Sequence, residues 1–563
     1  MYIQAEQIYT NCVIAMVDPA FSFAEAMAVS GGMITAVGDE KDIRNYQGPE
    51  TEVVDLKGAF VLPGISDAHL HASDYVHNLD HLPCDRYGTI EELKKAITEQ
   101  LTWDKTDWLI GNGLLQEVLD EGLSCRDLDE VASDVPVVLV MWHGHGCVAN
   151  SAAMRQSGIN SDTPDPPGGI VRKNPDGTPT GVMEEASALQ LVFAGMKPLT
   201  ADEIAVKLKR MQGIMNRMGY TAYTESTVGP ANNMREGGAS GEECLKAYQK
   251  LLLNHELTCR VSVGFYSGRG GKQSYEYLKE DVESGAIPKS VDEDWLSFHM
   301  LKFFCDGVET SHTAWMKQEY GDDPGNSGRS CFGDVDASDS EQVEELRRIL
   351  KLAHDSGYQI GIHTVGNRAV HEALEAILAA QKENPRNNCR HCLIHAEEFG
   401  DPEDMKRCSE NGLVVSAQPQ LGASMFLRDE QAIGQELSSR TMPLRALIDD
   451  GVILCGGSDS IAGEFHGWLE GIRSAVLREA SDGKPYHPEY CITLQEAIRM
   501  FTINGAYQEF AEKKRGSIEA GKFADFIVLD RNLFEIPPER ITDAKVIRTV
   551  VGGKTVYQEL QQA

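Results

Sequence analysis

The stretch Val61–Asp74, VLPGISDAHLHASD, contains the pattern that decides the fold. An apolar run is interrupted by Pro63 and Gly64 and then leads to His69 and His71, which are separated by one residue. Residues two apart on a β-strand point to the same face of its sheet. Two imidazoles that converge at the end of a strand suit a metal site. An isolated His-x-His pattern is equally compatible with two hydrogen-bonded polar residues at a strand end.

Further apolar, β-rich runs follow from about residue 200 onward, and helical patterns separate them. Two of these helices begin with capping boxes, one formed by Thr200 with Glu203 and the other by Ser338 with Glu341. Together with the strand that contains FVLPGIS, the runs give the strand count of a closed (β/α)8 barrel. The predicted fold class is therefore α/β, a TIM barrel. The runs are YTAYTES, CRVSVGFY, LSFHMLKFFCDG, YQIGIHTVG, RHCLIHAEE, GLVVSAQPQ and GVILCGGSDS.

The spacing of the runs predicts additions to the barrel. About 145 residues separate the first strand from the second, too many for one crossover helix, so we expect an inserted subdomain at about 75–200. The two ends of the chain, 1–58 and 515–563, contain short strands with glycine turns. We expect these ends to form one small composite β-sandwich domain, with the barrel and its insert at 59–514.

Composition narrows the class of protein. The 563 residues carry a formal net charge of −34, which argues against nucleic-acid or anionic-membrane partners because phosphate binding is driven by Lys and Arg. No basic leader precedes an apolar core, and nowhere do ~18 apolar residues run together. The 13 cysteines are an odd, scattered set that fits reduced thiols. We therefore expect a cytoplasmic protein, for which the sequence allows a homodimer without specifying one.

Other chemically active residues fall at the C-terminal ends of the predicted barrel strands. Active sites of barrel enzymes are built at that end, so these side chains should converge with His69 and His71. Four histidines with a carboxylate suit zinc, or another first-row divalent ion, better than magnesium or calcium. The further candidates are Lys302, Asp306, His363, His395 and Asp459.

Motifs in a fixed order carry a family resemblance. VLPGISDAHLH, IGIHTVGNRAV, LIHAEE, GGSDS and the tail GSIEAGKFADFIVLD together resemble the amidohydrolase superfamily. More narrowly, HGCVANSAAM, GGIVRKNPDGTPTGVMEEA, LKFFCDG and TAWMKQEYGDDPGNSG are similar to the YtcJ-like branch, amidohydrolase family 3, which includes N-substituted formamide deformylases. The resemblance covers almost the full length of the chain.

The resemblance implies a site with two metal ions. By its motifs, His69 and His71 bind the more buried ion together with Asp459, whereas His363 and His395 bind the second ion.

Lys302 matches a lysine that many superfamily members carry in carboxylated form as a bridge between the two ions. An unmodified Lys302 would instead favour a single-metal site. A divalent ion lowers the pKa of bound water from near 16 toward about 7, so metal-bound hydroxide can attack an amide-like carbon. Asp459, as ligand and neighbour of the nucleophile, is expected to act as general base and then as general acid.

Three further features have two interpretations each. A second His-x-His occurs at His143 and His145, where Gly144 loosens the strand geometry that a ligand pair needs. The resemblance implies that His145 faces the substrate and stabilises the developing oxyanion, while His143 is structural. Asp306 is expected either to contact the substrate or to form a turn. The loop 320–334 is either a lid over the barrel mouth or a surface loop.

The predicted function is that of a metal-dependent hydrolase of non-peptide C–N bonds in a small amide, formamide or cyclic amide. The expected cofactor is zinc, as one or two ions. The same chemistry at an amidine carbon, as in a deaminase, stays open. So does a barrel without catalysis that serves in binding or regulation, although the presence of every candidate ligand argues against it.

Overall fold

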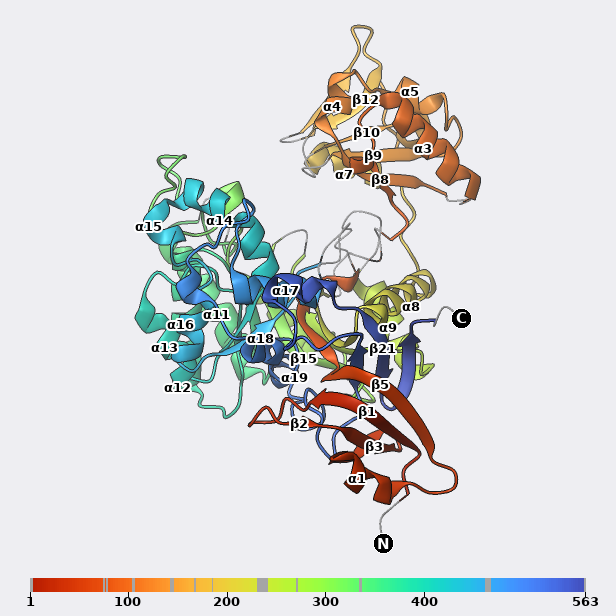
Figure 1. Ribbon diagram of the computed structural model, residues 1–563. Coiled ribbons are helices and arrows are strands. Elements are labelled where there is room, and N and C mark those ends of the chain that lie inside the picture. The colour runs from red at the N-terminus through yellow and green to blue at the C-terminus, as the bar shows by residue number, and fades with distance from the viewer. Residues whose placement is uncertain are drawn as a thin grey trace.

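The computed structural model describes residues 4–560 except 74–75, 77–78, 104–106, 142–145, 167–168, 185, 230–240, 270–271, 334–336 and 461–466. The described residues form three sheets surrounded by helices (Figure 1). Within these residues, none of the helices has the length and apolar character needed to cross a membrane.

Parallel strands form the central barrel. Their order, β19-β18-β17-β16-β15-β14-β13-β6, follows the chain, and seven of the eight coincide with the runs expected from sequence, so the prediction of an eight-stranded parallel barrel is confirmed. Strands β6 and β16 are buried along their whole length, as expected for parallel strands covered by helices. The strands are β6 (Ile65–Leu70), β13 (Tyr220–Val228), β14 (Arg260–Phe265), β15 (Leu296–Phe304), β16 (Gln359–Thr364), β17 (Cys392–His395), β18 (Val414–Ala417) and β19 (Ile453–Gly456).

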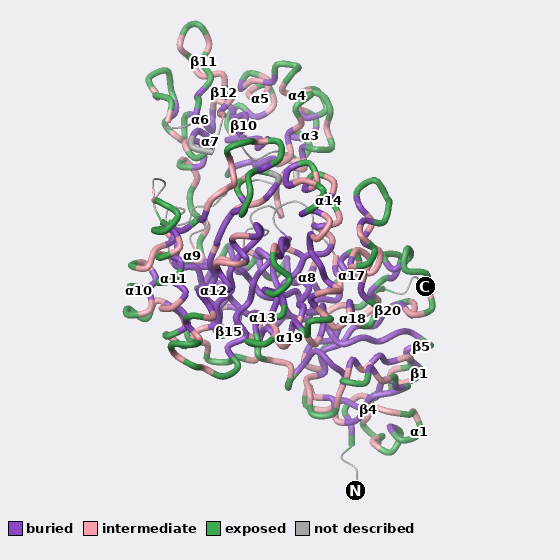
Figure 2. The backbone as a smooth tube through the Cα atoms, turned by 90° about the vertical axis from the view of Figure 1, so that its left-hand side faces the viewer, coloured by how far each residue is buried: buried purple, intermediate pink, exposed green. Residues whose placement is uncertain are grey.

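Amphipathic helices cover the barrel. In Figure 2 the buried part of the backbone is concentrated in the interior that these helices surround. Both predicted capping boxes are present, at Thr200 with Glu203 and at Ser338 with Glu341. The helices after the second strand are α9 (Gly241–Leu253), α10 (Tyr275–Ser284), α11 (Asp339–Asp355), α12 (Asn367–Glu383), α13 (Pro402–Glu410), α14 (Pro419–Ile433), α15 (Gln435–Ser438), α16 (Leu444–Asp449), α17 (Trp468–Leu477), α18 (Leu494–Met500) and α19 (Ile503–Gln508). Helix α8 (Ala201–Arg217) precedes β13.

The stretch VLPGISDAHLH belongs to two strands, so its interpretation as one barrel strand was wrong. Strand β5 (Glu52–Pro63) of another sheet ends at Pro63, and the barrel strand begins at Ile65. Gly64 joins them: its N–H donates to the Asp525 carbonyl at 2.9 Å, and a Cβ at this position would lie 2.2 Å from Thr221 Oγ1. The close approach of β13 therefore excludes a side chain at the joint.

Strands from both ends of the chain share one sheet. Strand β5 pairs with β1 on one side and with β20 on the other, so the expected β-sandwich is a single eight-stranded sheet. In Figure 1 it lies at the bottom of the molecule. Its remaining members are β1 (Gln7–Ala15), β2 (Phe23–Ala24), β3 (Ala26–Ser30), β4 (Met33–Gly38), β20 (Phe526–Leu529), β21 (Val546–Val551) and β22 (Lys554–Gln558). Helix α1 (Glu40–Ile43) packs beside it.

Residues between β6 and α8 build a third sheet with its own helices. It stands away from the barrel at the top of Figure 1, on the side opposite the terminal sheet. Its strand order is β11-β12-β10-β9-β8-β7. The elements are β7 (Leu82–Pro83), α3 (Ile90–Trp103), β8 (Leu109–Leu114), α4 (Gln116–Asp120), α5 (Cys125–Asp129), β9 (Val137–Met141), β10 (Gly146–Ala149), α6 (Ser151–Gln156), β11 (Ile170–Lys173), β12 (Pro179–Glu184) and α7 (Ala186–Phe193).

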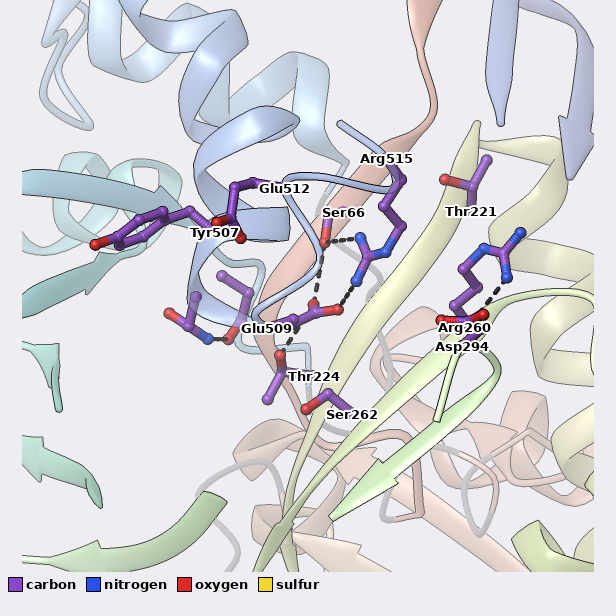
Figure 3. Close-up of polar contacts among 12 residues, drawn as sticks. Ser66, Thr221, Thr224, Arg260, Ser262, Asp294, Tyr507, Glu509, Glu512 and Arg515 are labelled. Atoms are coloured by element: carbon purple, nitrogen blue, oxygen red, sulfur yellow. Dashed lines mark hydrogen bonds and ion pairs between the residues drawn. The ribbon is translucent and has the colours of Figure 1, made fainter. Parts of the chain in front are cut away.

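A buried polar network connects the barrel to the segment that follows α19 (Figure 3). The Glu509 carboxylate accepts hydrogen bonds from Ser66 Oγ on β6 and Thr224 Oγ1 on β13, both at 3.1 Å, and pairs with Arg515. On β14, the Arg260 guanidinium donates two hydrogen bonds to Asp525, at 2.7 and 3.1 Å. These contacts fix the terminal sheet to the base of the barrel.

Replacing Asp525 with asparagine is expected to lower the free energy of unfolding by about 3–5 kcal/mol, because it leaves the buried Arg260 guanidinium without its counter-charge. Urea unfolding of the two proteins measures the difference. The matched control is Glu242→Gln, which breaks an exposed pair with Lys246 and should cost less than about 1 kcal/mol. Equal costs for the two substitutions would contradict a structural role for the buried pair.

Candidate metal centre

Three of the predicted ligands meet at the C-terminal end of the first barrel strand. His69 Nε2 lies 3.1 Å and His71 Nε2 lies 3.3 Å from Asp459 Oδ1. Potential ligand atoms of these three residues all lie within 4.8 Å of one another. Burial acts to raise the pKa of the Asp459 carboxyl, but its contacts with His69 and His71 hold that pKa well below the usual range, so the carboxylate is ionised.

The side chains of His69, His71 and Asp459 are chemically suited to bind a cation. Burial, followed by the charge of Lys302, holds the pKa of His69 well below its usual value, so the ring is neutral. Its Nδ1 contacts Ser226 Oγ at 2.7 Å, which leaves Nε2 as the atom that faces Asp459. Nε2 is buried and makes no hydrogen bond of acceptable geometry, although a carboxylate oxygen is 3.1 Å away. A metal ion between the imidazole and the carboxylate would satisfy both.

Backbone pairing brings the two parts of this group together. The Asp459 N–H donates to the His69 carbonyl at 2.8 Å, and the His71 N–H donates to the Ser460 carbonyl at 3.2 Å. Asp459 has a left-handed backbone with φ of 51°, which is uncommon for a residue other than glycine. Such strained positions persist where the surroundings over-determine them, often at functional sites.

Asp67 supports the group and was missed from sequence. Its Oδ1 accepts hydrogen bonds from the backbone N–H of His69 at 3.1 Å and of Ser458 at 2.9 Å, so one fully buried carboxyl holds both ligand-bearing segments. Burial raises its pKa to about 7. The available signal was a carboxyl-bearing residue inside a predicted strand, two positions before His69.

The other predicted ligands lie beside the first three. The ring centroids of His69 and His395 are 5.3 Å apart, and those of His395 and His363 are 4.6 Å apart. Burial lowers the pKa of both His363 and His395 to about 3, so these rings are neutral and able to bind a metal. Lys302 is fully buried on β15, and its charge contributes to lowering the pKa of all three histidines. The structure therefore brings the six predicted ligands together.

Backbone N–H groups donate hydrogen bonds to the carboxylate of Asp306. Its carboxylate accepts hydrogen bonds from the N–H groups of Trp315 at 2.9 Å, Val365 at 3.0 Å and Gly366 at 2.8 Å, and it is 2% exposed. Its Oδ1 also lies 3.3 Å from His363 Nδ1. Because these contacts surround both oxygens, the expected contact with substrate finds no support in the geometry. Asp306 instead fixes the backbone at Trp315 in the segment after β15 and at Val365 and Gly366 after β16.

Two other candidate features of the sequence are the second His-x-His pair and the loop 320–334. His143 and His145 lie outside the described residues. The described part of the loop expected at 320–334 is anchored: the Tyr320 hydroxyl donates to the Ala314 carbonyl at 2.8 Å, and the Gly321 N–H donates to the Ala432 carbonyl at 2.8 Å.

A second group, His354, Cys389 and His391, also has close ligand atoms. His391 Nδ1 accepts from the Ile360 N–H at 2.9 Å, which assigns the ring proton to Nε2. That nitrogen then donates to His354 Nδ1 at 2.9 Å, and His354 Nε2 donates to the Asn384 carbonyl at 2.7 Å. Every imidazole nitrogen is used, so the group is a hydrogen-bonded relay and leaves no lone pair for a metal.

The relay predicts a pH dependence of stability. Burial, followed by the charges of His354 and Arg386, lowers the pKa of His391 from 6.5 to about 3. Between these values the unfolded chain binds a proton that the folded chain does not. Folding with a neutral His391 therefore makes its full contribution to the free energy of unfolding above pH 6.5. This contribution falls by ~1.4 kcal/mol per pH unit below pH 6.5.

The variant His391→Gln tests this dependence, because an amide can also accept from Ile360 and donate to His354. The stability difference between wild type and variant should shrink by about 1 kcal/mol when the pH is lowered from about 7.5 to about 5.5. Urea midpoints at the two pH values measure it. Parallel pH dependence of the two proteins would show that His391 is not the titrating group.

Known proteins resemble this chain in sequence and in fold. The model of the family described as "Amidohydrolase family" matches residues 52–557. YtcJ of Bacillus subtilis is 29% identical over 95% of this chain and 96% of its own length, and the N-substituted formamide deformylase of Arthrobacter pascens is 28% identical over 97% of each. The crystal structure of an uncharacterized metal-dependent hydrolase from Pyrococcus horikoshii has the same fold, with a TM-score of 0.76 at 22% identity over 95% of this chain and 99% of that one. The chain therefore belongs to the amidohydrolase family.

Proposed function

We propose that this enzyme hydrolyses the C–N bond of a small amide, formamide or cyclic amide, with metal bound at the centre described above. Family membership supports metal-dependent hydrolysis of C–N bonds. The near full-length similarity to a formamide deformylase supports this substrate class. The observation that carries the proposal is the convergence of two histidines and an ionised carboxylate, whose potential ligand atoms lie within 4.8 Å of one another.

We assign the ligands in two sets. His69, His71 and Asp459 would hold one divalent ion, and His363 with His395 would hold the second. Nitrogen-rich ligands of this kind favour zinc. A divalent ion bound here supplies a water of lowered pKa and polarises the carbonyl of the substrate.

Asp459 moves the proton in this proposal. Its carboxylate is ionised, is 16% exposed, and lies beside His69 and His71, so it can accept a proton from the attacking water. The same carboxyl group then donates that proton to the leaving nitrogen. The side chains of His69 and His71 surround this carboxylate and exclude bulk water, because each is at most 5% exposed.

Lys302 is proposed to be carboxylated at Nζ. As an ammonium group it would place a positive charge next to His69, His363 and His395, where cations are to bind. Carboxylation removes that charge and supplies two oxygen atoms in its place. The modification therefore makes the site compatible with a second ion.

Substrate panels test the proposed function. Zinc-loaded protein is mixed with N-alkyl formamides, linear amides and cyclic amides, and release of the acid product is measured. We expect turnover of at least one compound, loss of activity on chelation and recovery on addition of zinc. Ammonia release from amidines alone would identify a deaminase instead. Full metal occupancy without turnover of any compound would favour a binding role.

A further inference from the structure

Four acidic side chains next to the metal centre take no part in the proposed chemistry. They come from the segment after β15, from the segment after β17 and from helix α14. All are at most 5% exposed. The four residues are Glu309, Glu397, Glu398 and Asp429. Both carboxylate oxygens of Glu309 and both of Asp429 are buried without a hydrogen-bond partner. One oxygen of Glu397 and one of Glu398 are also buried without a hydrogen-bond partner.

Packing places these carboxyl groups near the metal centre. Helix α14, which carries Asp429, packs against the short helical turn that begins at Glu309, and Glu397 and Glu398 follow the proposed ligand His395. Burial raises the pKa of Glu309 well above its usual value, and the charges of Glu397, Asp429 and Glu398 raise it further. The acidic cluster therefore adjoins the mouth of the barrel, on the face where barrel enzymes bind their substrates.

Among the residues that the structure describes, no lysine or arginine forms an ion pair with any of the four, and Arg440 pairs with the exposed Glu436. The charges of Arg428 and Arg440 act on the cluster without such a pair, because they lower the pKa of Asp429 and of Glu398. Burial of a carboxylate without a hydrogen bond or a cation is costly. A ligand that brings positive charge would remove this cost.

The spacing of the acidic oxygens decides which cation fits. Within the described residues, groups of three or more His, Cys, Asp or Glu side chains whose ligand atoms lie within 4.8 Å of one another occur only in the metal centre and in the His354 relay. The spacing of the acidic cluster therefore disfavours one metal ion held by three of its carboxylates. An ammonium or guanidinium group has donors that diverge and can reach separate carboxylates.

We propose that the acidic cluster is the specificity subsite for a substrate that carries an ammonium or guanidinium group, an inference that rests on the proposed function. Hydrolysis of the amide at the metal centre would take place while Glu309, Glu397 and Asp429 hold the cationic end. The formal net charge of −34 attracts such substrates to the protein and disfavours anionic ones.

Two matched formamides test the proposal. N-(4-aminobutyl)formamide and N-pentylformamide have the same length but differ in a terminal ammonium group against a methyl group. We expect kcat/KM to be ~10- to 100-fold higher for the cationic compound, mainly through a lower KM. Glu309→Gln and Asp429→Asn should each bring the ratio of the two kcat/KM values toward one. Glu430→Gln, next to Asp429 on α14, is the matched control and should leave the ratio at its wild-type value.

A binding experiment separates this inference from the proposed function. Calorimetry compares butylguanidinium with its neutral isostere butylurea on the zinc-loaded protein, and the expected preference for the cation is lost in Glu309→Gln. If no amide is hydrolysed but this preference is observed, the proposed function fails and the subsite stands. Equal binding and equal kcat/KM within both pairs would overturn the subsite. So would an additional calcium or magnesium ion that is present in wild type and absent from Glu309→Gln.

Discussion

Replacing Asp459 with asparagine is expected to reduce kcat by ~10³-fold or more on any substrate that the enzyme hydrolyses. Asparagine keeps the shape of the side chain but cannot take up the proton of the attacking water. It also weakens the contact with His69 and His71, whose Nε2 atoms face the carboxylate at 3.1 and 3.3 Å. Steady-state kinetics on the best compound of the panel measures the loss.

Metal analysis tells the two effects of Asp459→Asn apart. A variant that retains its metal and has lost kcat supports the proton-transfer role, whereas parallel losses of metal and activity assign the effect to metal binding. Asp450→Asn, an exposed carboxyl group just before β19, is the control and should stay within about threefold of wild type. Retention of near-normal kcat in Asp459→Asn would exclude the proposed role of this carboxylate.

Replacing Lys302 with methionine is expected to lower kcat/KM by ~10²-fold or more and to reduce bound metal from about two ions toward one. Methionine has nearly the length of lysine and can fill the same buried space next to Phe304. It cannot be carboxylated, so the two oxygen atoms that a modified Lys302 would offer to the metal ions are lost. Native mass spectrometry of the wild-type protein should also show the mass of one added carbon dioxide.

If Lys302 is not carboxylated in the wild-type protein, Lys302→Met should have the opposite effect on metal binding. The variant would then remove a buried positive charge from beside three histidines, and metal binding would be unchanged or stronger. Lys351→Met, at a half-exposed lysine on α11, is the control for the general effect of the substitution.

Sequence patterns were sufficient for the barrel and for the convergence of its candidate ligands. Apolar runs that alternate with capped helices predict the barrel strands, because parallel strands are buried on both faces. The convergence was predictable for the same reason, since polar residues at the ends of such runs meet at one edge. His69 and Asp459 are 390 positions apart in the chain, and topology alone joins them.

Features that depend on three-dimensional packing were not accessible. Asp306 has a position typical of a substrate-contacting residue, yet three backbone N–H groups occupy its carboxylate. Glu309 and Asp429 have no local signal because their burial results from the packing of α14 against the segment after β15. Pro63 and Gly64 signal an interruption of VLPGIS, but the sequence does not reveal that the two halves belong to different sheets or that Thr221 approaches Gly64 closely.

The shared sheet of the two termini has a consequence for the order of folding. Val61 pairs with Val528, so the strand that leads directly into the barrel has a partner that is made 467 positions later. Contacts between such distant positions slow folding, and a chain that still lacks β20 exposes the unpaired edge of β5 to aggregation. Chaperones that shield strand edges during this interval are therefore expected to raise the yield of active enzyme.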